Sequence, residues 1–125
     1  MGGRNLKDKI VSYIEDKFNI APEFIFQRSP KIAIFRHPKN KKWFAALLPV
    51  DAKKLNEKIA KKYSAELNIL NLKCDPSLAY ILCDNERIMP AYHMNKKHWI
   101  SINLDSEISA EQIFDLIDQS FELTR

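Results

Sequence analysis

Residues 70–105 read LNLKCDPSLAYILCDNERIMPAYHMNKKHWISINLD and predict a strand, a short helix, a polar loop and a second strand. The dipeptide Asp75-Pro76 predicts the helix start, because an aspartate side chain can cap free backbone N–H groups and proline is tolerated at the first helical position. After the loop, Ile100 and Ile102 alternate with polar residues, which is the period of a strand with one buried face. This segment therefore indicates a domain that mixes helices and strands.

The two ends of the chain carry the periodicity of amphipathic helices. In residues 5–19, apolar residues recur every three or four positions, and Asn5 is the expected N-cap. In residues 109–123, Ser109 followed by Gln112 matches a capping box ahead of a second apolar stripe. We therefore expect one helix at each end of the fold.

The middle of the chain supplies the remaining strands, which we expect at residues 31–35, 42–48 and 66–73. A short polar turn joins the first two strands, which predicts an antiparallel hairpin, and Pro49 is expected to end it. The third strand loses its alternation between Ile69 and Leu70, which indicates a β-bulge or burial on both faces. Residues 50–64 fit either a weak helical stripe or a basic loop. This order favours an α+β fold with a single antiparallel sheet and the two terminal helices packed on one face.

Length and composition indicate one soluble domain spanning residues 1–125. Hydrophobic residues make up 46% and charged residues 29% of the chain, which is typical of a globular protein. No apolar run is long enough to cross a membrane, so we expect no membrane partner. Two cysteines are too few for a disulfide framework, and we expect a reduced protein in the cytoplasm.

Glycine is nearly absent, and this excludes whole classes of nucleotide site. Gly2 and Gly3 are the only two glycines in the sequence. Loops that cradle phosphates need glycine for close backbone approach, so neither a P-loop nor a Rossmann fingerprint is present. Turns with left-handed backbone are instead expected at Asn40, Asn85 and Asn95.

Charge is distributed unevenly along the chain. Residues 24–63 contain eleven lysine and arginine residues and two acidic residues, for a net charge of +9, whereas the remainder carries −5. Such asymmetry within one domain predicts one basic face and one acidic face.

Several blocks of this sequence resemble the MmcQ/YjbR family. They are FRH (35–37), KKWFA (41–45), LNLKCDP (70–76), PAYHMNKKHW (90–99) and LIDQS (116–120). The resemblance covers nearly the whole chain and implies a frataxin-like α+β domain, a fold that has also been likened to a double-wing DNA-binding domain. The chain departs from the family pattern in residues 51–65, where a lysine-rich segment replaces a glycine-bearing loop.

The basic hairpin is the main candidate site. Cations on a protruding turn suit phosphates, and Trp43, Trp99 or Tyr92 could stack on bases. We expect double-stranded DNA as the partner. The alternatives are a solvated hairpin that binds nothing, and a protein-interaction module that binds an acidic partner and has neither nucleic-acid nor catalytic activity. The candidate nucleic-acid-binding residues are Arg36, His37, Lys39, Lys41, Lys42, Lys96 and Lys97.

Metal binding and catalysis are the competing chemistries. Cys74 and Cys83 lie nine positions apart, which does not match the usual spacing of zinc ligands, although His93 and His98 are five apart. Cys74 precedes a helix start and could be acidified there, with a histidine as its base. The alternative is that these polar groups hold the loop in place. We expect no metal, no cofactor and no enzymatic activity.

Overall fold

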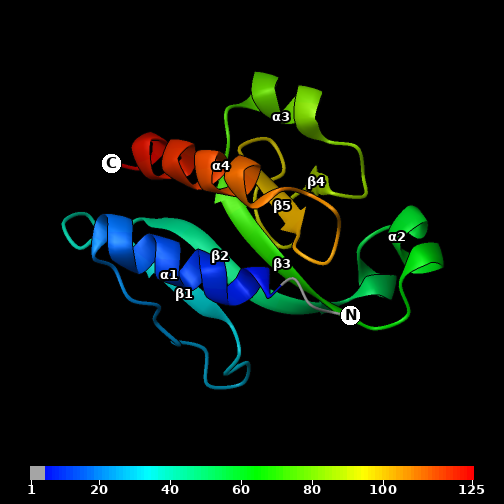
Figure 1. The fold of residues 1–125 in the computed structure, drawn as a ribbon, viewed down its shortest axis with the longest axis horizontal. Helices are drawn as coiled ribbons and strands as arrows, with labels where there is room; N and C mark the ends of the chain where they lie inside the picture. Colours follow the sequence, from blue (N-terminus) through cyan, green and yellow to red (C-terminus); the bar gives the residue numbers. More distant parts are fainter. Residues whose placement is uncertain (1–4) are drawn as a thin grey trace.

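A five-stranded antiparallel sheet with two long helices on one face forms the core of the computed structural model, which describes residues 5–125 (Figure 1). The strands are β1 (Ala33–Arg36), β2 (Trp43–Asp51), β3 (Glu66–Lys73), β4 (Ile88–Pro90) and β5 (Trp99–Asn103), in the spatial order β1-β2-β3-β5-β4. The helices are α1 (Leu6–Phe18), the 3-10 turn η1 (Ala52–Lys54), α2 (Glu57–Lys62), α3 (Pro76–Leu82) and α4 (Ala110–Leu123). The predicted α+β class and the packing of the terminal helices are therefore confirmed.

The face of the sheet against α1 and α4, here called the helix side, holds the main hydrophobic core. The apolar stripe of α1 includes Ile10 and Ile14, and that of α4 includes Ile113 and Ile117. The Ser109 hydroxyl accepts a hydrogen bond from Gln112 N–H at 3.1 Å, as the capping pattern predicts. Asn5 occupies the N-cap position of α1 as predicted, but its side chain makes no capping hydrogen bond.

A β-bulge in β2 changes which side chains reach the helix side. Phe35 pairs with Ala45 and Arg36 pairs with Trp43, so Phe44 is left without a partner on β1. Phe44 and Ala45 are both buried in the main core, and Trp43 instead contacts Phe26 edge to face. The bulge therefore turns Trp43 toward the opposite face of the sheet, here called the far side.

Ser120 on α4 forms hydrogen bonds with backbone groups beside this bulge. The Ser120 hydroxyl donates to the carbonyl oxygen of Phe44 at 2.6 Å and accepts from Lys73 N–H at 2.9 Å. Ser120 is fully buried, so these two bonds satisfy backbone groups that water cannot reach.

The second strand continues past the proline expected to end it. Pro49 pairs with Asn68 of β3, and β2 extends to Asp51. The pairing with β1 ends earlier, at Ala33 and Leu47. Proline is tolerated here because a strand position with no neighbour on one side needs no N–H donor there.

Strand β3 is buried on both faces, which was one of the two predicted explanations of its pattern. Leu70 and Leu72 join the main core, whereas Leu67 and Ile69 join a smaller core on the far side. Ile59 of α2 completes the smaller core, so residues 50–64 form η1 and α2 and not a basic loop.

The segment from α3 to β4 contains one confirmed cap and one missed strand. The Asp75 carboxylate accepts from Ser77 N–H at 3.0 Å and Leu78 N–H at 3.3 Å, as predicted. Strand β4 has only three residues and ends in Pro90, too short for a periodic signal. None of the helices in the described part of the chain is long and apolar enough to cross a membrane.

Candidate nucleic-acid interface

The turn between β1 and β2, residues 37–42, is fixed by hydrogen bonds and is here called the hairpin tip. His37 N–H donates to Lys42 O at 3.0 Å, and Lys41 N–H donates to His37 O at 2.9 Å. The Asn40 side chain accepts from Lys42 N–H at 2.8 Å and donates to the Thr124 carbonyl oxygen at 3.0 Å. The tip is therefore anchored to the C-terminal end of α4.

Two of the expected binding residues already have partners within the protein. The guanidinium of Arg36 forms a forked ion pair with Glu23, with its shortest contact at 2.6 Å. That hydrogen bonding lowers the pKa of Glu23 and raises the pKa of Arg36. The ring of His37 is 6% exposed, and its Nε2 lies 2.8 Å from the Thr124 hydroxyl. Both side chains therefore hold the hairpin in place through contacts within the protein.

Three lysines remain at the hairpin tip. The side chains of Lys39, Lys41 and Lys42 are exposed, and none forms an ion pair with a carboxylate within residues 5–125. The backbone of Lys41 has φ = 64°, so Lys41 and not Asn40 occupies the left-handed position. The tip consequently presents three exposed lysines on a fixed backbone.

The loop before β5, residues 91–98, carries the other two candidate lysines. The Asn95 side chain accepts from Lys97 N–H at 2.9 Å and His98 N–H at 3.3 Å, which shapes the turn before β5. The ammonium of Lys96 donates to Ala91 O at 2.6 Å and thus folds back on the loop. Lys97 is exposed and lines a cleft with Trp99.

The topology brings the hairpin tip and the 91–98 loop to the same end of the sheet. Strands β2 and β5 both run antiparallel to β3 and flank it, so they begin at the same end. Two strand spacings separate them there, or about 10 Å. Lys42 and Lys97, which precede these strands, therefore lie along one edge of the domain.

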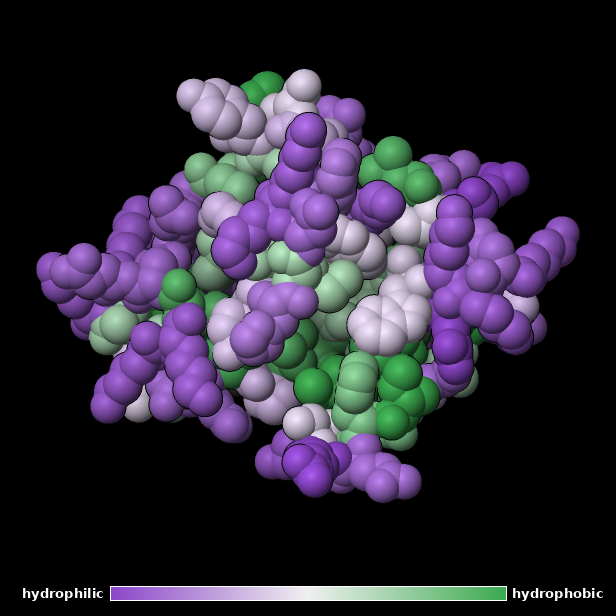
Figure 2. All heavy atoms as spheres, turned by 180° about the vertical axis from the view of Figure 1, so that it is seen from behind, coloured by the Kyte–Doolittle hydropathy of each residue, from purple (hydrophilic) through white to green (hydrophobic). Residues whose placement is uncertain are grey.

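An exposed apolar segment lies beside this edge and has no counterpart in the sequence predictions. Phe24, Ile25 and Phe26 are 60%, 44% and 38% exposed, and the ring of Phe26 contacts Trp43. Figure 2 shows hydrophobic side chains gathered in the lower part of the far side, where β1 lies, with hydrophilic side chains around them. Three consecutive apolar residues in a segment without strand or helix periodicity were the available signal in the sequence.

The candidate nucleophile is unsuited to catalysis. Burial raises the pKa of Cys74 to about 11, and the charges of Asp75 and Cys83 add to the rise. The hypothesis that the helix start acidifies Cys74 is therefore wrong. His93 lies in a far-side cleft, away from the main core that contains Cys74. Across residues 5–125, no three His, Cys, Asp or Glu side chains gather closely enough to hold a metal ion.

Comparison with known proteins identifies the class of this domain and then its family. An antiparallel sheet with two terminal helices on one side defines a small α+β domain. Residues 17–123 match the family model YjbR, and the chain belongs to the YjbR family, as its sequence blocks predict. The uncharacterized protein YyaQ of Bacillus subtilis (strain 168) is 38% identical over 119 residues, covering 95% of this chain and 98% of YyaQ. The uncharacterized protein YjbR of Escherichia coli (strain K12) is 35% identical over 54 residues, covering 42% of this chain and 46% of that protein.

Solved structures share the fold. A crystal structure of a Pseudomonas syringae protein superposes with a TM-score of 0.87 at 34% identity, covering 95% of this chain and 98% of that one. The Deinococcus radiodurans protein DR2400 has a TM-score of 0.68 at 24% identity, over 94% of this chain and 76% of that chain, which shows a common fold alone. The five-stranded architecture is thus that of YjbR-family structures.

Proposed function

We propose that this protein is a non-enzymatic module that binds double-stranded DNA through its hairpin tip. The observation that carries the proposal is the set of three exposed lysines, Lys39, Lys41 and Lys42, on a turn fixed to α4. A protruding turn of this kind suits the phosphate backbone, because lysine ammonium groups neutralise phosphates and release their counterions. Cys74 and Cys83 are both free, which supports a reduced protein, and we place it in the cytoplasm.

The residues that the structure offers for DNA binding differ from the set expected from the sequence. Lys97 extends the positive edge from the hairpin tip toward β5. Arg36 and His37 act as positioning residues, since they tie the hairpin to Glu23 and to Thr124. Lys96 is not included, because it folds back on the 91–98 loop and lines the far-side cleft that contains His93.

The salt dependence of binding tests the electrostatic part of the proposal. If about four phosphates are neutralised, log K should fall with log salt at a slope of roughly −3 to −4. The measurement is fluorescence anisotropy with a labelled duplex of mixed sequence at several salt concentrations. Absence of binding even at low salt would contradict the proposal.

Charge reversal at the hairpin tip tests its location. We expect the triple variant Lys39→Glu, Lys41→Glu, Lys42→Glu to abolish binding while it unfolds at nearly the same urea concentration, because exposed charges contribute little to stability. The matched control, Lys7→Glu, Lys9→Glu, Lys61→Glu, makes the same change in net charge at exposed positions on α1 and α2. Equal losses in both variants would show that net charge, and not the hairpin tip, governs binding.

An acidic protein partner is the second candidate, and the exposed segment Phe24–Phe26 favours it. Apolar side chains next to a basic turn suit a protein surface that is acidic at its rim and apolar at its centre. Replacing Phe24 and Phe26 with serine should leave DNA binding unchanged if duplex DNA is the partner. A protein complex would lose affinity in that variant, so the same substitution separates the two candidates.

A further inference from the structure

A cleft on the far side, distinct from the hairpin tip, has the size and lining of a small-molecule site. Its volume is about 490 Å³, which lies within the usual range for ligand pockets. Its walls come from the end of η1, the turn before β4 and the 91–98 loop. The lining residues are Lys54, Leu55, Asn56, Asn85, Met89, Pro90, Tyr92, His93 and Lys96.

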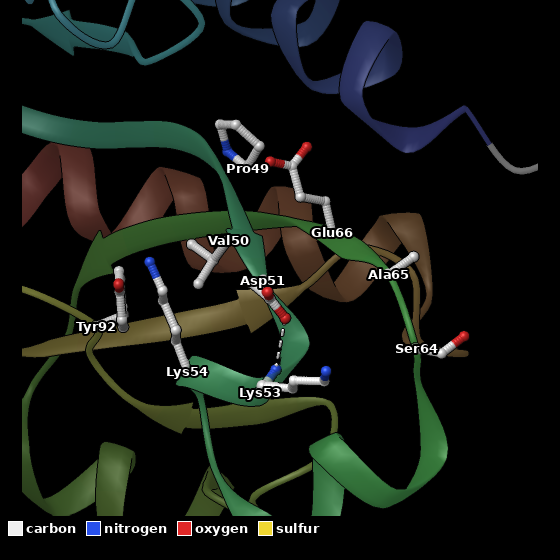
Figure 3. A pocket seen from close by; sticks show the side chains of 9 residues that line it. All are labelled: Pro49, Val50, Asp51, Lys53, Lys54, Ser64, Ala65, Glu66 and Tyr92. Carbon is white, nitrogen blue, oxygen red and sulfur yellow. Dashed lines mark hydrogen bonds between the residues drawn. The ribbon is translucent and has the colours of Figure 1, made fainter.

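Two lysines bring positive charge to this cleft. Lys54 and Lys96 reach it from two different elements, and of the described residues that line it none is acidic. Figure 3 shows the Lys54 side chain extending from η1 beside Tyr92, where this cleft adjoins a neighbouring one. Neither ammonium forms an ion pair within the described residues, so both charges are available to a ligand.

The acidic residues of the turn before β4 are occupied by other partners. Glu86 forms ion pairs with Lys58 and Lys62 on α2. Partial burial alone would raise the pKa of Asp84, but hydrogen bonds from the backbone N–H groups of residues 86–88 and from the Arg87 side chain hold that pKa well below its usual range. The acids of the turn before β4 therefore do not neutralise the cleft.

The positions of the polar groups are set by hydrogen bonds within the cleft wall. Lys96 uses one of its three ammonium donors for Ala91 O, which fixes the charge and leaves two donors for a ligand. Asn56 accepts from Ile59 N–H at 2.9 Å and donates to Asn85 O at 3.1 Å, which ties α2 to the turn before β4.

The lining also includes an apolar floor and an exposed ring. Met89 is 3% exposed and lies under the cleft, with Pro90 beside it. The ring of His93 lies 4.0 Å from that of Tyr92, centroid to centroid. His93 has φ = 59°, a left-handed backbone that is unfavourable for a residue with a Cβ atom. The chain therefore holds the imidazole over Tyr92 against its own backbone preference.

We propose that this cleft binds a small organic phosphate. Lys54 and Lys96 hold the phosphate group, and the organic part lies on Met89 and Pro90 with its ring or sugar against His93. Ammonium groups without acidic partners select an anion, and the apolar floor favours a phosphate ester over inorganic phosphate. This site uses none of the hairpin lysines, so its test does not depend on whether the protein binds DNA.

The test is a titration of the ¹⁵N-labelled protein, followed by amide NMR shifts, with three probes. Adenosine 5′-monophosphate should shift the amides of Lys54, Asn85, His93 and Lys96 in a saturable manner, with a dissociation constant of about 1 mM or tighter. Inorganic phosphate should shift the same amides but bind more weakly, and adenosine should not bind measurably. Equal affinity for the ester and inorganic phosphate would overturn the organic part of the proposal, and equal affinity for adenosine would overturn the phosphate part.

The double variant Lys54→Gln, Lys96→Gln tests the two charges against a matched control. We expect it to weaken binding of adenosine 5′-monophosphate by about tenfold or more, since each lysine supplies a charge-assisted hydrogen bond. The control Lys7→Gln, Lys9→Gln removes the same charge from exposed positions on α1 and should bind as the unaltered protein does. Equal weakening in both, or no saturable shift at these four amides in the unaltered protein, would refute the site.

Discussion

The two faces of the sheet are built from the same strands but are closed in different ways. On the helix side, two long helices cover a continuous apolar core that includes Phe35, Phe44 and Leu72. On the far side, the short elements η1 and α2 and the 91–98 loop cover a much smaller core around Ile59 and Ile69. The helix side is therefore closed by regular packing, and the far side by irregular segments.

This difference explains where the candidate sites lie. Regular helices pack against a sheet with few gaps, whereas short turns and loops leave clefts between them. The cleft lined by Lys54 and Lys96 and the exposed segment Phe24–Phe26 both accompany the irregularly covered parts of the molecule. We propose that the helix side mainly supplies stability, whereas the far side carries the candidate cleft.

The largest expected effect comes from deleting an aromatic ring on the helix side. Phe44 is fully buried, and its ring contacts those of Phe18, His37 and Phe121. We expect Phe44→Ala to lower the free energy of unfolding by about 3–5 kcal/mol, because the lost contacts leave a cavity that the helices cannot fill. Urea unfolding followed by circular dichroism measures this change.

The matched control for that substitution is Phe26→Ala on the exposed segment. Phe26 is 38% exposed, so the same truncation should cost about 1 kcal/mol or less. Similar losses at the two positions would contradict the view that stability resides on the helix side.

An intermediate effect is expected from the buried polar network that anchors the 91–98 loop to the far side. The Asn71 amide donates to Tyr92 O at 3.0 Å and accepts from the Ser101 hydroxyl, which in turn accepts from Tyr92 N–H at 2.8 Å. Asn71→Ala leaves buried groups without partners and should cost about 1–3 kcal/mol in the free energy of unfolding. It should also speed hydrogen exchange at the Tyr92 amide.

A double variant shows whether these groups act as one unit. Asn71→Ala with Ser101→Ala should cost less than the sum of the single substitutions, because both remove the same network. Strict additivity would indicate that Asn71 and Ser101 contribute independently and do not form one network.

Most of the fold was accessible from sequence because its signals are local. The stripes of α1 and α4 and the caps at Asp75 and Ser109 depend on residues within a few positions of each other. Strand β4 was missed because three residues carry no period. Of the expected left-handed asparagines, Asn85 is confirmed, whereas Lys41 and His93 take the positions expected near Asn40 and Asn95.

The candidate site was less accessible, because composition does not tell which charges are already used. Sequence identifies the lysines of the hairpin, but the pairing of Arg36 with Glu23 links positions thirteen apart across an irregular segment. The burial of His37 depends on Thr124, eighty-seven positions away. Lys54 was not among the site residues expected from the sequence, because the cleft that it lines depends on the distant 91–98 loop.

The smallest expected effect is the pH dependence that His37 gives to the helix side. Burial lowers the pKa of His37, and the charges of Arg125 and Lys42 also lower it, while the Phe121 carbonyl and Glu122 oppose them. The folded state therefore prefers the neutral ring, and the unfolded state binds the proton more readily. The contribution to stability is complete above the unfolded pKa of about 6.5 and is lost as pH falls from there through the lower folded pKa.

Urea midpoints measured between about pH 7.5 and about pH 5 test this linkage. The unaltered protein should lose stability over this range, and His37→Gln, which cannot titrate but can still bond to Thr124, should lose less. Three carboxylates have lowered pKa values and titrate below this pH range, so they do not contribute to the change in stability. They are Glu23, Asp84 and Glu86. An unchanged pH dependence in the variant would mean that burial does not lower the pKa of His37 in the folded protein.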